Sequence, residues 1–438
     1  IMKLETTLLP YLTNTSKLLS LLSSQGNLVA LESANGDHEN GRWSIISAGP
    51  IQQLKITEQG NTNTLLKNLE VFFEALPSQS HELPFIGGLL GHVSYDLGKS
   101  DMKGAPPPSF SDQPKLVAGV YTWAFVIDHR EAKTYLVYWH EVSIVPRGKL
   151  LQLFEQSQQP NKDKFELTQP FSPLWGKQQY KQKIQAIHDY IDSGDCYQIN
   201  LAQCFKGTYQ GSTIEAYQRL KETAQVPYAS YFECDGLNFA SLSPEMFIDC
   251  CDGQITTKPI KGTQPRSPSP ELDDRYKAHL KESVKDRAEN LMIVDLLRND
   301  LSINATQVRV PRLFDIESFS TVHHLVSTIT AQINPDASPL KLFLEAFPGG
   351  SITGAPKKRA MEIIAELESF PRSFYCGSSF YYSVNGNFSS NILIRSFLFQ
   401  DNEILTWSGG GIIADSKWEM EYQESLDKIS RLMDSLKA

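Results

Sequence analysis

The run Lys258-Pro259-Ile260-Lys261-Gly262-Thr263 holds a lysine between a proline and a glycine, in a segment that follows an apolar stretch. Proline restricts the backbone ahead of Lys261 and glycine frees the backbone behind it, so local geometry places this lysine. An amine held in this way can act as a nucleophile when it is neutral. The alternative from the sequence alone is a solvated loop cation.

Two segments with helical spacing each carry a pair of acidic residues three positions apart. The pairs are Asp286 with Glu289, and Glu421 with Glu424. Residues three apart share one helix face, so each pair presents two carboxylates in one direction, as a divalent cation with oxygen ligands requires. The alternative is a solvated face on which Glu424 pairs with Lys428 four residues later.

Two glycine-containing runs are candidates for close contact with a ligand. Residues 347–357, which include Thr353 and Gly354, lead into an amphipathic helix, where free backbone N–H groups can bind a carboxylate or a phosphate. The spacing of a P-loop is absent. Gly410 and Gly411 lie in a second run that follows a predicted strand and allows close backbone approach. Either run can also be a plain tight turn.

Two further side chains each have two possible roles. His324 lies in an apolar segment and is either a catalytic group or a core histidine with its hydrogen bonds satisfied. Arg395 lies in a predicted strand and can hold a carboxylate through two hydrogen bonds or pair with a structural acid.

The composition is that of a globular protein of 438 residues, 41% hydrophobic and 21% charged. A net charge of −9 disfavours nucleic acid and anionic membranes as partners, so any anionic substrate must be met by local groups. The six cysteines show neither CxxC nor zinc-finger spacing and are expected to be reduced thiols. No eighteen-residue apolar run and no signal-peptide pattern are visible, which predicts a cytoplasmic protein.

Residues 101–114 and 156–173 break the pattern of periodic segments, and the second break divides the chain into predicted regions 1–165 and 166–438. Strands come in groups with helices between the groups, which predicts an α+β sandwich with large antiparallel sheets flanked by helices. In the second region, strands are expected at 246–250, 389–399 and 403–408, and helices at 283–299, 357–367 and 418–436. Residues 264–275 are expected to form a loop, either a lid over Lys261 or an inert excursion.

From about Trp175 to the C-terminus, this ordered set of runs resembles the chorismate-binding enzymes. The matching stretches include Gly194-Asp195-Cys196-Tyr197-Gln198-Ile199-Asn200-Leu201, Ser243-Pro244-Glu245, Pro259-Ile260-Lys261-Gly262-Thr263 and Lys285-Asp286-Arg287-Ala288-Glu289-Asn290. The first third resembles the family weakly, through Leu31-Glu32-Ser33 and Arg42-Trp43-Ser44-Ile45-Ile46. The resemblance implies the fold of the anthranilate synthase large subunit.

The resemblance also implies roles for matching positions. Glu289 and Glu424 are expected to be the Mg²⁺ ligands that hold the ring carboxylate of chorismate, with Asp286 and Glu421 in support. Glu245 is expected to be the general acid. Lys261 and His324 complete the expected catalytic set, and the expected substrate contacts are Thr353, Gly354, Tyr381, Arg395, Gly410, Gly411 and Lys428.

Two positions discriminate within the family. Relatives that add water to C2 carry a lysine base where Gln198 stands, and an amide cannot deprotonate water. Anthranilate synthases usually carry alanine where Lys261 stands. The chain therefore most closely resembles the aminodeoxychorismate synthases, in which this lysine is proposed to attack C2 before ammonia enters at C4.

The same resemblance implies two partners and leaves two rivals open. The chain lacks the Gly-x-Cys-x-Gly elbow of a glutaminase, so ammonia is expected from a separate glutamine amidotransferase subunit. Leu31, Glu32, Ser33 and Trp43 resemble the tryptophan pocket of the family, with an aromatic amino acid as effector or as structural filler. The rivals are an anthranilate synthase large subunit and a catalytically silent regulatory subunit.

Overall fold

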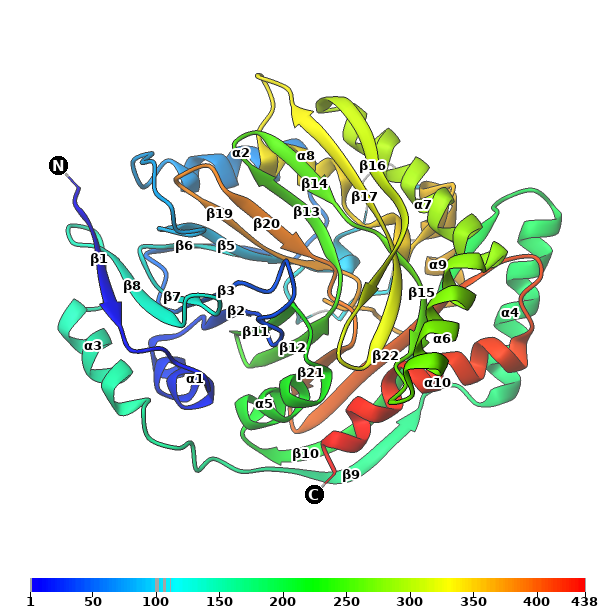
Figure 1. Ribbon diagram of the computed structural model, residues 1–438, viewed down its shortest axis with the longest axis horizontal. Helices are drawn as coiled ribbons and strands as arrows, with labels where there is room; N and C mark the ends of the chain where they lie inside the picture. Colours follow the sequence, from blue (N-terminus) through cyan, green and yellow to red (C-terminus); the bar gives the residue numbers. More distant parts are fainter. Residues whose placement is uncertain (1, 99–101, 105–107, 111, 438) are drawn as a thin grey trace.

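The computed structural model describes residues 2–98, 102–104, 108–110 and 112–437. Its strands form two large sheets surrounded by helices (Figure 1), and every strand pairing within these residues is antiparallel. The predicted α+β class with large antiparallel sheets is confirmed. Part of the predicted break at 101–114 lies outside the described residues.

The larger sheet has twelve strands. Its order is β1 (Leu4–Leu9), β8 (Lys133–Trp139), β7 (Trp123–Asp128), β3 (Trp43–Ser47), β2 (Val29–Glu32), β11 (Tyr228–Cys234), β12 (Leu237–Ser243), β21 (Ser396–Gln400), β22 (Glu403–Ile412), β10 (Gln198–Gly211) and β18 (Gly354–Ala355), with β9 (Phe165–Pro173) also paired to β10.

The smaller sheet has ten strands. Its order is β15 (Ile260–Pro265), β17 (Val322–Ile333), β14 (Gln254–Thr257), β13 (Met246–Cys251), β20 (Phe388–Asn391), β19 (Ser378–Ser383), β5 (Gly88–Val93), β6 (Leu116–Tyr121) and β4 (Gln52–Ile56), with β16 (Ala305–Ser318) also paired to β17. Strands from before and after residue 165 therefore contribute to both sheets.

Helices cover the outer faces and the ends of the sheets. They are α1 (Ser16–Leu22), α2 (Thr62–Phe73), α3 (Arg147–Gln156), α4 (Lys177–Asp192), α5 (Thr213–Ala224), α6 (Pro270–Glu282), α7 (Val284–Ser302), α8 (Pro339–Ala346), α9 (Lys357–Leu367) and α10 (Trp418–Ser435), with 3₁₀ turns η1 (Ser23–Gln25), η2 (Tyr95–Leu97) and η3 (Gly350–Ile352). Helices α6, α7 and α10 gather beside β15 on one side of the molecule (Figure 1). None of the helices in the described ranges is long and apolar enough to span a membrane.

The hydrophobic core has two parts, one on each face of the twelve-stranded sheet. Ile45 and Ile46 are neighbours on β3, yet Ile45 belongs to the cluster shared with the ten-stranded sheet and Ile46 to the cluster beneath the outer helices. Successive strand residues point to opposite faces, so strands buried on both sides need apolar residues at consecutive positions. This explains the nearly continuous apolar runs of β6 and β7.

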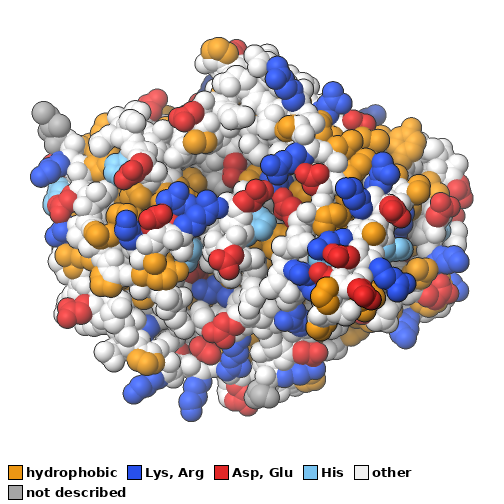
Figure 2. Space-filling view, viewed as in Figure 1, with side chains coloured by type: hydrophobic (Ala, Val, Ile, Leu, Met, Phe, Trp, Pro, Cys, Tyr) orange, Lys and Arg blue, Asp and Glu red, His pale blue; other side chains and the backbone are white. Residues whose placement is uncertain are grey.

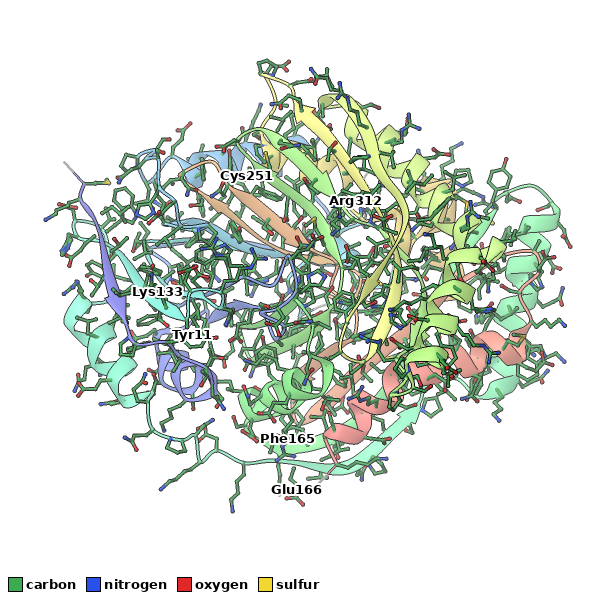
Figure 3. The ribbon with its side chains drawn as sticks, in the orientation of Figure 1. Tyr11, Lys133, Phe165, Glu166, Cys251 and Arg312 are labelled. Atoms are coloured by element: carbon green, nitrogen blue, oxygen red, sulfur yellow. The ribbon has the colours of Figure 1, made fainter. Side chains whose placement is uncertain are left out.

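Several predicted boundaries are wrong for physical reasons. The predicted strand 389–399 is two strands in different sheets, β20 and β21, because the backbone turns at Arg395 with φ +52°. The predicted loop 264–275 contains the end of β15 and the start of α6. The predicted break at 156–173 contains β9, which begins at Phe165 (Figure 3). The long β16–β17 hairpin was not predicted.

The cysteines are free thiols, as the sequence predicts, and the surface carries charges of both signs. Five cysteines are buried and free, while Cys251 is exposed at the end of β13 (Figure 3). On the face shown in Figure 2, acidic and basic side chains are interspersed. Affinity for an anionic substrate must therefore come from the immediate surroundings of the site.

Candidate active site

Lys261 lies in an irregular part of β15. The register between β15 and β17 shifts between Ile260 and Thr263, so Lys261 and Gly262 form a bulge. Gly262 has φ +91°, and a Cβ there would lie 2.9 Å from Cγ of Asp286 on α7. Lys261 points toward η3, where its Nζ donates a hydrogen bond to the carbonyl oxygen of Ser351 at 3.0 Å. The bulge thus turns the lysine toward the acids of α7.

The environment of Lys261 favours the neutral amine. Burial lowers the pKa of the Lys261 ammonium below its usual value, and the nearby Lys428 acts in the same direction. Glu289 and Glu245 oppose this change because their negative charges stabilise the ammonium. The net direction agrees with the nucleophile expected from the sequence.

Glu245 lies in the connection between β12 and β13 and is only 5% exposed. Burial raises the pKa of Glu245 to about 7, although the charges of Lys261 and Arg395 act to lower it. Its Oε1 lies 3.5 Å from the backbone nitrogen of Ile260, next to Lys261. A carboxyl group with such a pKa is partly protonated at neutral pH and can donate a proton.

His324 is a buried, neutral histidine on β17. Burial lowers the pKa of its imidazole to about 3, and the charge of Arg395 adds to the effect. Its Nδ1 lies 3.0 Å from Oγ1 of Thr263, and the ring also forms a hydrogen bond with the backbone of Gly262. These contacts brace β15 beside Lys261, while a direct role in catalysis stays a prediction.

The acidic residues of α7 and α10 lie in one region of the structure. Lys285 Nζ lies 3.9 Å from Glu289 Oε1 and 3.6 Å from Glu421 Oε1, so a residue of α7 bridges the two helices. Glu289 is buried, and burial raises its pKa even though Lys261 and Lys285 act to lower it. Its Oε1 has no hydrogen-bond partner in the described part of the chain. A buried carboxylate oxygen in this state is a free donor atom for a cation or a water molecule.

Glu424 differs from Glu289 in being exposed and in having its cation at hydrogen-bond distance. Burial of its carboxyl acts to raise the pKa of Glu424, but Lys428, with Nζ 2.8 Å from Oε1, outweighs this effect and the pKa is lowered. No three His, Cys, Asp or Glu residues in the described ranges come together closely enough to form a metal site by themselves. The predicted metal ligands Asp286, Glu289, Glu421 and Glu424 thus share one region without forming a closed cage.

The glycines of β22 leave space beside these acids. A Cβ at Gly410 would lie 3.6 Å from both Glu421 Oε2 and Lys428 Nζ, and a Cβ at Gly411 would lie 2.2 Å from Gln198 Nε2. Lys428 Nζ also donates to the carbonyl oxygen of Gly409 at 3.1 Å. A side chain at Gly411 would displace the Gln198 amide, whereas a Cβ at Gly410 would only contact Glu421 and Lys428.

Thr353 and Gly354 form the other glycine-containing wall. Thr353 is fully buried, and its hydroxyl donates to the carbonyl oxygens of Gly349 and Gly350 at 3.0 and 3.3 Å. Gly354 has φ +150°, and a Cβ there would lie 2.1 Å from the carbonyl oxygen of Gln198. The turn is therefore rigid, with the hydroxyl used inside the fold.

Arg395 is half-buried between β20 and β21. Within the described ranges its guanidinium forms no hydrogen bond and no ion pair. Burial lowers the pKa of Arg395, whereas the nearby Glu245 acts to raise it. A partly desolvated guanidinium with free donors is suited to bind a carboxylate.

Tyr381 does not join this group. It lines a separate cavity of about 380 Å³ together with Leu31, Glu32 and Trp43, three of the four residues of the predicted tryptophan pocket. The fourth, Ser33, does not line the cavity; its hydroxyl accepts a hydrogen bond from the backbone of Asn35. Strands β17, β14, β13 and β20 separate β19 from β15 in the ten-stranded sheet, so Tyr381 lies away from Lys261, and its contact with the substrate stays a prediction.

Sequence reasoning missed a buried ion pair that supports the site. Arg372 pairs with Glu368 at 2.8 Å and donates to the carbonyl oxygens of Ile352 and Asn200, each at 2.8 Å. It thereby joins η3, which carries the acceptor for Lys261, to β10. Neither residue belongs to a motif, so the sequence alone offers no signal for this contact.

The geometry can be compared with known proteins. Residues 27–434 match the family model described as chorismate binding enzyme. The chain belongs to this family. It is 40% identical to aminodeoxychorismate synthase component 1 of Escherichia coli over 93% of this chain and 92% of that protein. The protein of the same name from Klebsiella aerogenes is 40% identical over 96% of each chain.

Relatives with other names are more distant. Anthranilate synthase component 1 of Aquifex aeolicus is 32% identical over 93% of this chain and 89% of its own length. Among solved structures, anthranilate synthase component I from Streptococcus pneumoniae has a TM-score of 0.78 at 27% identity, covering 90% of this chain and 92% of its own. These likenesses confirm the expected anthranilate synthase large-subunit fold.

Proposed function

We propose that this chain is the chorismate-aminating subunit of an aminodeoxychorismate synthase, which converts chorismate and ammonia to 4-amino-4-deoxychorismate on the route to 4-aminobenzoate. The observation that carries the proposal is the lysine Lys261, with a lowered pKa, beside the carboxyl of Glu245, with a raised pKa. The 40% identity to proteins named aminodeoxychorismate synthase component 1 supports it.

The proposed reaction has two allylic displacements. The neutral amine of Lys261 attacks C2 of chorismate, the double bond shifts, and the 4-hydroxyl leaves as water after accepting a proton from Glu245. Ammonia then attacks C4, the double bond shifts back, and the Lys261 amine is released. The lysine is regenerated, and nitrogen replaces oxygen at C4.

The other side chains have binding roles in this proposal. Arg395 offers free guanidinium donors to a substrate carboxylate, and Lys428 adds positive charge beside Gly410. Glu289 and Glu424 would hold Mg²⁺, with Asp286 and Glu421 in support. Oε1 of Glu289, which accepts no hydrogen bond in the described part of the chain, fits a metal-ligand role, and the ion would supply positive charge to a ring carboxylate.

Two partners follow from the same proposal. Ammonia comes from a separate glutamine amidotransferase subunit, for which ammonium salt should partly substitute. Tryptophan is proposed for the cavity of about 380 Å³ next to Trp43 and Glu32, whose carboxylate is held by Lys221 at 3.0 Å. The activity is proposed to be cytoplasmic.

The test is mass spectrometry of the products formed from chorismate, Mg²⁺ and ammonium salt by the wild type and by Lys261→Ala. We expect aminodeoxychorismate from the wild type, and a protein adduct equal to chorismate minus water when ammonia is omitted. The variant should form no adduct. Anthranilate and pyruvate as products would instead identify an anthranilate synthase, and unchanged chorismate would identify a silent subunit.

A further inference from the structure

Lys258 lies three residues before Lys261, and the proposed reaction does not use it. Its side chain is only 8% exposed, yet it is charged and paired twice. Its Nζ contacts Glu39, in the connection between β2 and β3, and lies 2.5 Å from Oε1 of Glu317 on β16. The two ion pairs thus tie the residue three positions before Lys261 to carboxylates from distant parts of the chain.

The segment that follows Lys258 depends on contacts outside the regular strand pairing for its position. Because β15 leaves its register between Ile260 and Thr263, the bulge that carries Lys261 lacks the regular hydrogen bonds of a ladder. Its orientation therefore depends on the residues on either side. After the bulge, Thr263 is held by His324. Before the bulge, the Pro259 carbonyl oxygen accepts hydrogen bonds from Asn290 Nδ2 and the Ser327 backbone, both at 3.3 Å, and the ion pairs of Lys258 hold the residue ahead of it.

The two anchors belong to one connected cluster. His38 Nε2 lies 3.4 Å from Glu317 Oε2, and the His38 ring stacks on Phe319 with the ring centres 4.7 Å apart. Phe319 in turn meets His324 edge to face at 5.1 Å. The contacts thus run from Lys258 through Glu317, His38 and Phe319 to His324, so both sides of the bulge are held by the same packed group.

We propose that Lys258 is a positioning residue: its ion pairs with Glu317 and Glu39 fix residues 258–263 so that the Lys261 amine faces Ser351 and Glu245. The kinetic part of this inference rests on the proposed function, whereas the part that concerns the order of the segment does not. A displacement of about 1 Å in a reacting group can lower a rate about 100-fold.

The test compares Lys258→Met, Lys258→Arg and Lys206→Met. Lys206 pairs with Glu403 at the surface of β10 and serves as the matched control. For Lys258→Met we expect kcat to fall about 10- to 100-fold with the KM for chorismate changed less than about three-fold, because the amine and not the substrate pocket is displaced. Arginine should restore most of kcat, and the control should match the wild type.

Hydrogen exchange of the backbone amides provides a readout that does not depend on the reaction. In Lys258→Met, exchange in residues 258–265 should be at least about ten-fold faster, with α2 and α4 unchanged. The double variant Lys258→Met with Glu317→Gln removes the buried charge that has lost its lysine, so it should regain thermal stability without regaining kcat.

The outcomes are distinct. A kcat of Lys258→Met that is unchanged, or that falls only with the folded fraction and returns in the double variant, would overturn the positioning role. If the wild type forms no aminodeoxychorismate, the proposed function fails, and unchanged exchange in residues 258–265 would then still refute the inference.

Discussion

Replacing Glu245 with glutamine tests the central pair of the site. Glutamine keeps the size of the side chain and its ability to donate a hydrogen bond, but it cannot transfer a proton to a leaving hydroxyl. General acid catalysis contributes about 10²- to 10⁴-fold to a rate, so adduct formation by Lys261 should slow by about that factor. The rate should be measured by intact-protein mass spectrometry without ammonia, so that ammonia's own protonation does not affect the result.

The pH dependence of the rate of adduct formation is more informative than the factor by which the rate falls. In the wild type the adduct forms from the state in which Lys261 is neutral and Glu245 is protonated. The rate should fall at high pH as Glu245, with its pKa of about 7, loses its proton, and at low pH as Lys261 gains one. Because the two charges interact, both limbs report the pair as a unit. In Glu245→Gln the fall at high pH should disappear.

Stability should change with pH in a direction set by the same group. The pKa of Glu245 rises from an ordinary 4.5 to about 7 on folding, so the favourable contribution is complete below pH 4.5 and is lost as the pH rises through 7. A factor of ten in an ionisation constant corresponds to about 1.4 kcal/mol, which makes the buried carboxylate cost about 3 kcal/mol at pH 8. In denaturant unfolding, the free energy of unfolding of Glu245→Gln relative to that of the wild type should therefore rise by about 3 kcal/mol between pH 4.5 and 8.

Glu317 supplies a control with the opposite sign. Hydrogen bonds from His38 and Lys258 outweigh the effect of its burial and lower the pKa of Glu317 to about 2, so its contribution is present above pH 4.5 and is lost as the pH falls toward 2. Relative to wild type, Glu317→Gln should thus lose stability as the pH rises. An adduct rate for Glu245→Gln within about ten-fold of wild type, or a stability difference independent of pH, would refute the assignment of Glu245 as a buried acid.

Three further outcomes are expected. Glu289→Gln and Glu424→Gln should each raise the Mg²⁺ concentration for half-maximal activity at least about ten-fold, equivalent to about 1.4 kcal/mol, and an unchanged Mg²⁺ titration would remove both from the metal site. Arg395→Met should raise the KM for chorismate about 10- to 100-fold, since a hydrogen bond to a charged group contributes about 1.5–3 kcal/mol; an effect on kcat alone would contradict a binding role. Gly354→Ala should lower the free energy of unfolding by about 1–3 kcal/mol, because its Cβ would lie 2.1 Å from the backbone oxygen of Gln198, and denaturant titration of a variant as stable as wild type would contradict that contact.

The sequence was most informative where chemistry and periodicity coincide. A three-residue spacing puts Asp286 with Glu289, and Glu421 with Glu424, on one face of their own helices α7 and α10, but the meeting of the two helices, which Lys285 bridges, depends on tertiary packing. Tyr381 and Arg395 mark the limit of the same reasoning. Both lie in or next to strands that pair with distant segments, and strand periodicity does not say which sheet a strand joins. Hence the pattern of residues 389–399 predicts one strand although its halves lie in different sheets.

The protonation states of the site depend on these long-range pairings. Lys261, on β15, and Glu245, in the connection between β12 and β13, are 16 positions apart in the sequence. Their burial requires η3 and α7, which the chain reaches about 30 to 90 residues later. Desolvation acts in opposite directions on an ammonium and a carboxylate, so one packing event lowers the pKa of the lysine and raises that of the glutamate. The proposed nucleophile and the proposed acid are therefore prepared together, and a change that opens η3 should weaken both at once.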